Sequence, residues 1–343
     1  MNLVEYSFTI SIEDGAVFEA ERGDSILQAA LRLGIGFPYG CSSGSCYSCK
    51  YELLDGEVID TKRGFNALSI RDRKKNRHLG CQSFPKGPAL IRVRTDRQYV
   101  PKYKPEKCNA VLVERKTITH DMSELMFKTD GYANFISGQY ILLSVPGIKE
   151  TRAYSMSNIS NNDGQWQFHV KKVKDGKFSN VLINSLSLGS EVNFDGPFGH
   201  AYVRTDNNRD VVCVAGGSGL GPMLSIVRHL ANESSARFRK VYFFFGGRRP
   251  KDMICEKYIQ PFAKNFSELS IYNSVSERSK NNLDNWSGSV GFIHELVENV
   301  LNVRAPEFEF YAAGPPAMID SLVRLLQLKR NVPFEQIHYD SFF

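Results

Sequence analysis

The sequence has little that would place it in a membrane or outside the cell. Its apolar runs are short, and Val241–Phe245 falls far below the roughly 20 apolar residues that cross a bilayer. Met1–Tyr6 lacks the basic and apolar succession of a secretory signal. We therefore expect a cytoplasmic protein with no membrane-spanning segment.

Cysteine is scarce, and the seven cysteines of this 343-residue chain argue against a framework of disulfides. An odd number without an export signal is unusual for such a framework, and four of the seven are clustered, which favours a metal site. The other three stand alone, and isolated cysteines are usually small buried apolar residues. These three are Cys108, Cys213 and Cys255.

Excess charge is also small, because the formal net charge is +6 and acidic residues are interspersed among the basic ones. This distribution gives no indication of a nucleic-acid partner. The densest basic run is Arg71–His78. It is interpreted either as a solvated loop or helix face or as a docking surface for an acidic partner.

Internal repeats and low-complexity tracts are absent as well, which favours three unlike domains in series. The first covers residues 1–98, where Ser7–Phe18 predicts a β-hairpin. The periodic segment that begins at Ser25 predicts a helix that stops at Gly34. Residues 99–107 are rich in Pro and Lys, and we interpret them as an extended linker.

The second and third domains differ in their pattern. Residues 108–205 carry short β-prone runs separated by Gly, Asn, Asp and Pro, which favours an antiparallel barrel with one helical stretch at Phe178–Leu188. Residues 206–343 alternate apolar strands with amphipathic segments, which is typical of a parallel α/β sheet. We interpret Asp195–Gly199 as a turn with a structural role.

Four cysteines have the spacing of an iron–sulfur site. The pattern is C-x4-C-x2-C followed by a fourth cysteine, and the small residues between the first three let backbone amides face charged sulfurs. A tetrahedral zinc site is the alternative, although such sites usually contain two short C-x2-C pairs. The predicted metal ligands are Cys41, Cys46, Cys49 and Cys81.

A second pattern, RAYS, is suited to a flavin nucleotide. Its Arg can pair with a pyrophosphate, its Tyr can stack on an isoalloxazine ring, and its Ser hydroxyl can reach a ring nitrogen. The later KDGKFS segment leads into a helical stretch and can present amides and a hydroxyl to phosphate. The candidate cofactor contacts in this domain are Arg152, Tyr154, Ser155, His169, Val170, Gly176 and Ser179.

A glycine-rich loop, GGSGLGP, follows an apolar strand in the third domain and precedes an amphipathic segment. Glycines at that place let backbone amides approach a pyrophosphate, and the pattern differs from the Rossmann G-x-G-x-x-G. Arg248 and Arg249 follow the next strand and either accept a phosphate or face solvent. The candidate contacts are Gly216, Gly217, Ser218, Gly219 and Arg248.

The first hundred residues resemble a plant-type ferredoxin domain, and the rest resembles the ferredoxin–NADP reductase superfamily. That superfamily carries R-x-Y-S/T, G-x-x-S, GGTG-x-x-P and Y-x-C-G-P-x-x-M. The resemblance implies a multidomain α+β and α/β fold, with a β-grasp ferredoxin domain, an antiparallel β-barrel that binds FAD and a parallel α/β domain that binds nicotinamide. It also implies that the RAYS and KDGKFS residues hold FAD.

The last of these motifs corresponds to Tyr311–Met318 and departs from the family pattern at one position. Ala313 stands where the family has a Cys near the nicotinamide ring, so we expect a slower hydride transfer. Gly314 and Pro315 are retained and are candidate nicotinamide contacts. Phe343 is interpreted either as an aromatic lid over the flavin or as a core anchor. With Tyr154 and Ser155, it is a candidate catalytic residue.

The order of cluster, flavin and nicotinamide resembles the reductase components of bacterial multicomponent oxygenases. The segments GIKETRAYSMSN, GPPAMID and HYDSFF are most similar to reductases of diiron toluene, phenol and alkene monooxygenases. Reductases of Rieske aromatic-ring dioxygenases are nearly as similar. A sugar-deoxygenation reductase and a non-catalytic redox sensor or scaffold are further alternatives.

The resemblance implies an NADH-dependent oxidoreductase, with NADPH not excluded as the donor. Hydride would pass from NADH to FAD, and single electrons would then pass through a 2Fe-2S cluster to a terminal oxygenase or an intermediate ferredoxin. We expect the chain to act as a monomer and to meet its electron acceptor at the rim of the cluster loop, which includes Tyr47.

Overall fold

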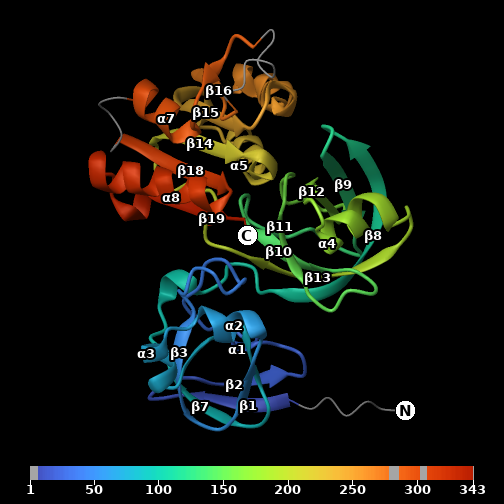
Figure 1. The fold of residues 1–343 in the computed structure, drawn as a ribbon, viewed down its shortest axis with the longest axis vertical. Coiled ribbons are helices and arrows are strands. Elements are labelled where there is room, and N and C mark those ends of the chain that lie inside the picture. The colour runs from blue at the N-terminus through green and yellow to red at the C-terminus, as the bar shows by residue number, and fades with distance from the viewer. Residues whose placement is uncertain (1–6, 278–285, 302–306, 343) are drawn as a thin grey trace. The chain divides into compact units, whose positions relative to one another are not determined.

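The computed structural model describes residues 7–277, 286–301 and 307–342, which form two compact units (Figure 1). The N-terminal unit contains Met1–Lys107 together with Asp195–Gly199. The C-terminal unit contains Cys108–Phe194 and His200–Phe343. None of the helices in the described residues is long and apolar enough to cross a membrane.

The N-terminal unit is built on a five-stranded sheet with the strand order β2-β1-β7-β3-β5. The predicted hairpin and helix are confirmed: β1 and β2 pair antiparallel, and α1 begins after the N-cap Ser25. The bounds in this unit are β1 (Ser7–Ile12), β2 (Val17–Glu21), α1 (Ile26–Arg32), β3 (Lys50–Asp55), β4 (Val58–Asp60), α2 (Lys62–Ala67), α3 (Ile70–Lys74), β5 (Arg77–Leu79), β6 (Ser83–Pro85) and β7 (Ala89–Arg92).

Helix α1 has the sequence features of a helix with one buried face. Ser25 and Gln28 form a capping box, in which the side chain of each residue accepts a hydrogen bond from the backbone amide of the other. Apolar residues of α1 are buried against the sheet, as the period of its sequence predicts. The helix ends before Gly34, which adopts the left-handed conformation with φ +77°.

The first part of the C-terminal unit is a six-stranded sheet with the order β11-β10-β13-β8-β9-β12. The pairs β8–β9, β9–β12 and β10–β11 are antiparallel, and aromatic and aliphatic side chains fill the interior. These elements are β8 (Glu106–Thr117), β9 (Met122–Lys128), β10 (Tyr140–Ser144), β11 (Arg152–Ser155), β12 (Gln165–Lys171), α4 (Lys177–Asn180), a π-helical turn (Val181–Ser185) and β13 (Glu191–Phe198).

Two expectations about segment boundaries are modified here. Strand β8 begins inside residues 99–107, the segment interpreted as a linker. The segment interpreted as a turn, Asp195–Gly199, instead contains the last four residues of strand β13, which ends at Phe198, and it groups with the N-terminal unit. The chain therefore leaves the C-terminal unit for five residues and then returns to it.

The second part of the C-terminal unit is a wholly parallel sheet with the order β17-β16-β15-β14-β18-β19. Its elements are β14 (Asp210–Gly216), a 3-10 turn (Gly217–Gly219), α5 (Leu220–Ala231), β15 (Lys240–Gly247), α6 (Cys255–Ile259), β16 (Glu268–Val275), β17 (Ser289–Val290), α7 (Ile293–Leu301), β18 (Phe308–Gly314), α8 (Pro316–Arg324) and β19 (Ile337–Ser341).

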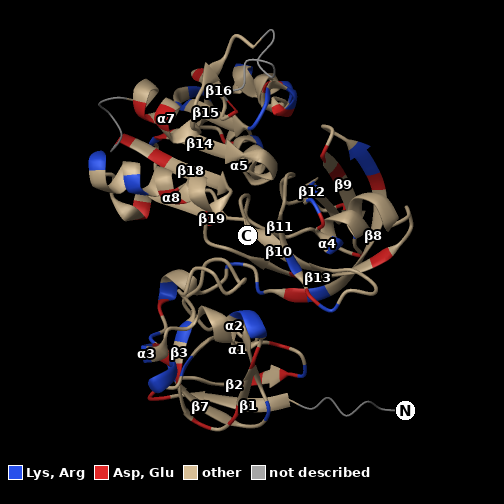
Figure 2. Ribbon diagram, in the orientation of Figure 1, with Lys and Arg blue, Asp and Glu red and all other residues tan. Residues whose placement is uncertain are grey.

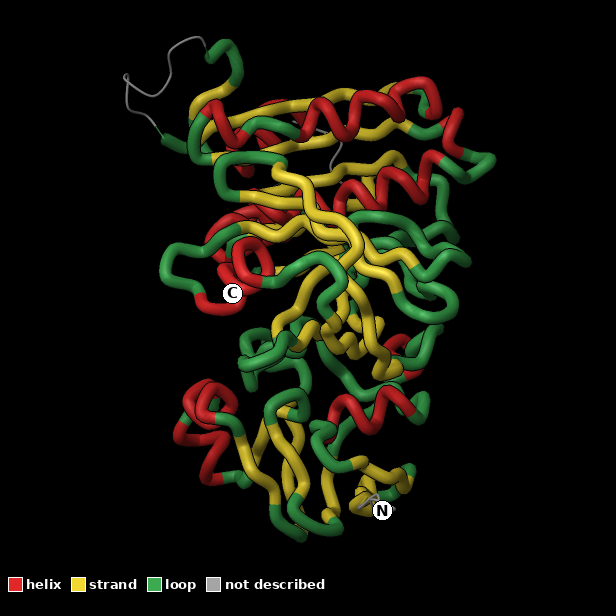
Figure 3. The backbone as a smooth tube through the Cα atoms, turned by 90° about the vertical axis from the view of Figure 1, so that its right-hand side faces the viewer, coloured by secondary structure: helices red, strands yellow, loops and turns green. Residues whose placement is uncertain are grey.

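Helices cover both faces of this sheet (Figures 1 and 3). In β14, Val211 and Cys213 pack on the face covered by α5 and α6, whereas Val212 and Val214 pack on the face covered by α7 and α8. A strand buried on both faces explains the continuous apolar sequence that predicted it. The predicted fold class of ferredoxin domain, antiparallel barrel and parallel α/β domain is confirmed.

Candidate cofactor sites

The four cysteines predicted as metal ligands lie in one region of the N-terminal unit. Cys49 and Cys81 are buried, and their Sγ atoms are 3.4 Å apart. Cys41 Sγ accepts hydrogen bonds from the backbone amides of Ser43, Ser45 and Cys46 at 3.3–3.4 Å. The same geometry suits the thiolates of an iron–sulfur cluster, whose negative charge is stabilised by such amides.

The electrostatics of Cys41 agree with this geometry. Hydrogen bonds from the Cys46 thiol and from Ser43 lower the pKa of the Cys41 thiol, and the same contact between the two thiols raises the pKa of Cys46. A thiol that ionises readily is the form that binds a metal. Cys46 is exposed, and so is Tyr47, which is 47% exposed in the loop that was predicted to form the rim.

Gln82, which the sequence analysis missed, connects this loop to α2. Its side chain amide donates to the carbonyl oxygen of Cys81 at 3.0 Å, and its Oε1 accepts from the Thr61 hydroxyl at 2.7 Å. Arg63 donates from α2 to the Ser45 hydroxyl at 2.5 Å. The sequence contains one indication of this role, because Gln82 directly follows the predicted ligand Cys81.

The three isolated cysteines lie apart from the four predicted metal ligands. Cys213 and Cys255 are buried, as predicted for small apolar residues. Cys108 is only half-buried at the start of the barrel, so that prediction was wrong for this residue. Strand β8 presents alternate residues to solvent near its start, which explains the difference.

The two predicted flavin motifs meet in the C-terminal unit. Tyr154 on β11 stacks on the Phe178 ring with centroids 6.0 Å apart, and the Arg152 guanidinium lies 5.9 Å from the centroid of the same ring. Burial raises the pKa of Tyr154 above its ordinary value, so its hydroxyl stays protonated. Sequence reasoning missed Phe178 as the contact between the motifs, although it is part of KDGKFS.

The Gly176–Ser179 loop is held by its own hydrogen bonds. Ser179 is buried, and its hydroxyl accepts from the Val173 amide at 3.1 Å and lies 3.4 Å from the carbonyl oxygen of Gly176. The hydroxyl therefore already has partners in the loop. Arg152 is exposed, and its guanidinium donates to the Thr151 carbonyl oxygen at 2.8 Å. Arg152 is thus the more accessible of the two predicted phosphate contacts.

Strand β12 places its two predicted contacts in the interior. Val170 belongs to the barrel core, and the His169 side chain is fully buried with Nε2 3.1 Å from Glu124. Burial lowers the pKa of His169, although Glu124 opposes this effect. Without movement of these side chains, only their main-chain atoms could contact a cofactor. Both therefore stay predictions.

The predicted nicotinamide residues gather at the carboxyl edge of the parallel sheet. The glycine loop follows β14, and Gly314 and Pro315 follow the adjacent strand β18. Sequential connections from β14 lead to β15, β16 and β17 on one side, whereas β18 and β19 lie on the other. The two segments thus flank the point where the strand order reverses, which is where open α/β sheets bind ligands.

Close packing between these segments requires glycine. A Cβ atom at Gly219 would lie 2.0 Å from the carbonyl oxygen of Ala313, and one at Gly314 would lie 2.7 Å from Cε of Met318. No real Cβ approaches another atom so closely, so a side chain at Gly219 would displace the backbone, whereas one at Gly314 would displace the Met318 side chain. Ala313, at the position of the family Cys, is fully buried beside this contact.

Arg248 and Arg249 at the end of β15 have different environments. The guanidinium of Arg249 forms an ion pair with Glu277, in which Nη2 lies 3.1 Å from Oε1. Arg248 is exposed, and its backbone amide donates to Asp252 at 3.0 Å. Glu277 was not predicted, because it lies 28 residues from Arg249 in the sequence. Phe343 lies outside the described residues.

Family models match three segments of the chain. Residues 10–86 match a 2Fe-2S iron-sulfur cluster binding domain, residues 109–202 an oxidoreductase FAD-binding domain, and residues 213–324 an oxidoreductase NAD-binding domain. These three matches contain all the residues of the cysteine site, the RAYS and KDGKFS motifs and the glycine loop.

Two curated proteins match along almost the whole chain. The ferredoxin–NAD(P)+ reductase CarAd of Metapseudomonas resinovorans is 38% identical over 340 residues, which cover 98% of this chain and 100% of that protein. The ferredoxin–NAD+ reductase component of the alkene monooxygenase system of Xanthobacter autotrophicus is 31% identical, and the match covers 96% of this chain and 99% of that protein.

A solved structure has the same fold over its full length. It is titled ferredoxin reductase in carbazole 1,9a-dioxygenase, and it matches with a TM-score of 0.88 and 35% identity. The match covers 100% of both chains.

Proposed function

Because the chain belongs to the family of ferredoxin–NAD(P)+ reductases and oxygenase reductase components, we propose that it supplies an oxygenase system with single electrons from NADH. When bound, FAD accepts a hydride and releases its two electrons singly, and a 2Fe-2S cluster carries one electron at a time. The observation that carries the proposal is the gathering of the four spaced cysteines in one region, with backbone amides donating to Cys41 and with Cys49 and Cys81 in contact. The same chain also has a glycine-lined sheet edge.

The residues of the chain then bind and orient the cofactors. Cys41, Cys46, Cys49 and Cys81 would hold the cluster. Arg152 would pair with the FAD pyrophosphate, and the protonated Tyr154 and the Ser155 hydroxyl would contact its ring. Hydride transfer needs no protein acid or base, so alignment of the donor with the acceptor is the contribution of these residues.

The glycine loop and Gly314 would hold the nicotinamide nucleotide at the reversal of strand order. Gly217 and Ser218 are the partly exposed residues of this loop, and the start of α5 directly after it favours the negative pyrophosphate. Glu277 supports NADH as the donor. Its carboxylate neutralises Arg249 and would repel a 2′-phosphate, so one of the two arginines suited to NADPH is already occupied.

Two acceptor systems are supported to different degrees. The segments GIKETRAYSMSN, GPPAMID and HYDSFF favour the diiron monooxygenases. The higher overall identity to the CarAd reductase and the similarity to the ferredoxin reductase in carbazole 1,9a-dioxygenase favour an aromatic-ring dioxygenase. In either system, the acceptor would be a terminal oxygenase or an intermediate ferredoxin. A monomer acting in the cytoplasm remains part of the proposal.

The proposal is tested with two artificial acceptors. Ferricyanide can take electrons from the flavin, whereas cytochrome c reduction is expected to need the cluster. Cys49→Ser should remove the iron–sulfur absorbance and nearly all NADH-dependent cytochrome c reduction, with ferricyanide reduction retained. Cys108→Ser is the matched control and should change neither activity. Unbleached flavin after anaerobic addition of NADH, or full cytochrome c activity in Cys49→Ser, would contradict the proposal.

A further inference from the structure

The net positive charge of the chain is concentrated in one segment of the N-terminal unit. Residues 61–77 contain seven Lys or Arg and one acidic residue, an excess equal to the formal +6 of the whole chain. The acidic residue, Asp72, is paired with Lys50 and Arg77 at 3.0 and 3.4 Å. The remaining formal charges of the chain balance, so this segment accounts for the whole formal excess of positive charge.

The same segment exposes apolar side chains among the charges. Phe65 is 53% exposed and Ile70 is 68% exposed. The Arg73 guanidinium lies 5.0 Å from the centroid of the Phe65 ring, a cation–π contact that joins α2 to α3. Figure 2 shows Lys and Arg on both helices. We call this surface the basic face, and its exposed residues are Lys62, Arg63, Phe65, Ile70, Arg71, Arg73, Lys74 and Lys75.

The basic face adjoins the cysteine site. Arg63 donates to Ser45, which lies between two of the cysteines, and Thr61 at the start of α2 donates to Gln82. Gln82 in turn donates to the main chain of Cys81. Helix α2 is therefore hydrogen-bonded to both parts of the cysteine site, and a protein bound to the basic face would lie beside it.

We propose that the basic face is the docking surface for an acidic redox protein that receives the electron. This inference rests on the proposed function and adds the chemistry of the partner. Opposite charges accelerate and orient the encounter, and exposed apolar side chains such as Phe65 and Ile70 supply contact area once the two proteins meet. The partner therefore carries Asp and Glu around its own redox centre.

The test compares two haem proteins as acceptors for the holoenzyme, acidic cytochrome b5 and basic cytochrome c. With NADH as donor, cytochrome b5 should have the lower KM. Its KM should rise steeply when salt is raised from about 20 to 300 mM, because the Debye length falls below the separation of the charges. The KM for cytochrome c should stay flat or fall over the same range.

Single variants locate the effect. Lys74→Glu should raise the KM for cytochrome b5 roughly fivefold at low salt and lower the KM for cytochrome c, since the sign of one charge is reversed. Ile70→Ser should raise the KM for cytochrome b5 about threefold without changing its salt dependence. Arg22→Glu is the matched control, because Arg22 is exposed and follows β2 at the opposite edge of the sheet from β5.

The outcomes separate the docking surface from the function of the protein. Equal salt dependence for the two cytochromes, or equal effects of Lys74→Glu and Arg22→Glu, would overturn the basic face as the docking surface. In both cases, NADH-dependent reduction of ferricyanide would continue. If the unmodified holoenzyme does not reduce ferricyanide with NADH, the proposed reductase function is itself contradicted.

Discussion

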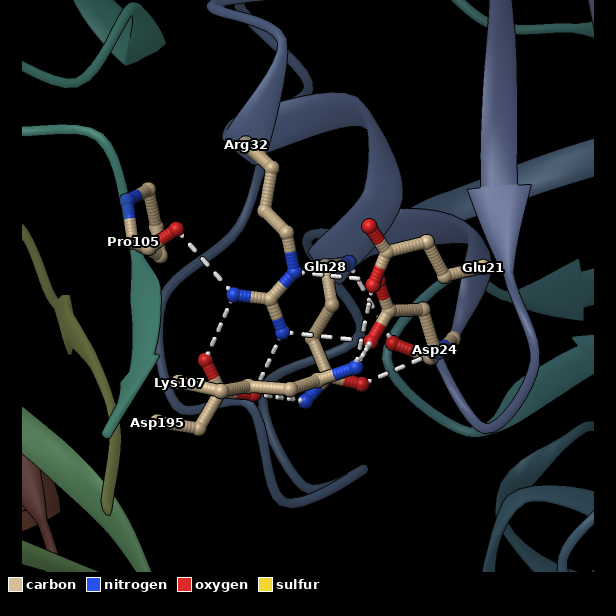
Figure 4. A network of polar contacts seen from close by, with 8 residues as sticks. Glu21, Asp24, Gln28, Arg32, Pro105, Lys107 and Asp195 are labelled. Carbon is tan, nitrogen blue, oxygen red and sulfur yellow. Dashed lines mark hydrogen bonds and ion pairs between the residues drawn. The ribbon is translucent and has the colours of Figure 1, made fainter. Parts of the chain in front are cut away.

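Arg32 and Asp195 are 163 residues apart in the sequence, yet the guanidinium of Arg32 donates two hydrogen bonds to the carboxylate of Asp195, each 2.8 Å long (Figure 4). Burial would lower the pKa of Arg32, but hydrogen bonds to Asp195 and Asp24 raise it above its ordinary value. Gln28 also donates to Asp195 at 2.6 Å. This network fastens Asp195–Gly199 to α1 in the N-terminal unit.

Replacement of Asp195 by alanine should destabilise the N-terminal unit. The Arg32 side chain is only 14% exposed, so removal of its partner leaves a mostly buried cation with fewer contacts. We expect a loss of about 2 kcal/mol, less than for a fully buried pair because some solvent reaches both side chains. The midpoint of urea-induced loss of cluster absorbance measures it.

The control for Asp195→Ala is Glu57→Gln, which breaks an exposed ion pair with Lys86. Exposed pairs contribute little, so its midpoint should stay close to that of the unmodified protein. Similar midpoints for both variants would show that the Arg32 network adds no stability.

Gly219→Ala should weaken nicotinamide binding. The new methyl group would meet the carbonyl oxygen of Ala313, so the loop after β14 has to move away from β18. We expect the KM for NADH to rise at least tenfold, about 1.4 kcal/mol, with visible absorbance of both cofactors retained. Gly87→Ala is the control because open space surrounds Gly87. An unchanged KM in Gly219→Ala would place the nucleotide elsewhere.

Glu277→Gln should improve the use of NADPH. Loss of the carboxylate frees the Arg249 guanidinium and removes a negative charge that opposes the 2′-phosphate. The KM for NADPH should fall roughly fivefold, while the KM for NADH changes little. The same measurement on Glu256→Gln, an exposed residue of α6, controls for the change in net charge. A parallel change for both nucleotides would refute this assignment of Arg249.

The C-terminal unit should lose stability in mild acid through His200. Burial, reinforced by the positive charge of Arg204, lowers the pKa of His200 from its ordinary 6.5 to about 4. Below pH 6.5 the unfolded chain binds a proton that the folded protein excludes, so this contribution is complete above pH 6.5 and is lost as the pH falls toward 4. Between pH 7.5 and 5 the loss amounts to about 2 kcal/mol.

The thermal midpoint of flavin release, followed by fluorescence between pH 7.5 and 5, reports this loss. His200→Gln should flatten the pH dependence, since Gln does not titrate. His120→Gln, at an exposed histidine whose side chain is 42% accessible, should leave it unchanged. An identical slope in His200→Gln and the unmodified protein would assign the acid sensitivity to other groups.

Short sequence motifs predicted those parts of the candidate sites that are formed by a single continuous segment. The spacing of Cys41, Cys46 and Cys49 reflects a single loop, and the glycine loop after β14 reflects one strand-to-helix turn. The period of the sequence likewise predicted α1 and the doubly buried β14. In each of these cases, the residues that form the loop, helix or strand lie within about ten positions of one another in the sequence.

Contacts between distant segments could not be predicted in the same way. The ion pair of Arg249 with Glu277 and the packing of Phe178 between Arg152 and Tyr154 depend on how strands and loops return to one another. His169 shows the converse difficulty. Its predicted cofactor contact stays a prediction, and the sequence did not indicate that its side chain is buried against Glu124.

The five residues Asp195–Gly199 also bear on how such reductases can recombine. A ferredoxin segment exchanged as residues 1–107 alone would leave behind the carboxylate that pairs with Arg32 and the Gly199 amide that donates to the Tyr39 hydroxyl. A transferred ferredoxin segment keeps these contacts only if the gene also supplies Asp195–Gly199. Changes in α1 are therefore coupled in evolution to changes in β13, which is encoded far downstream.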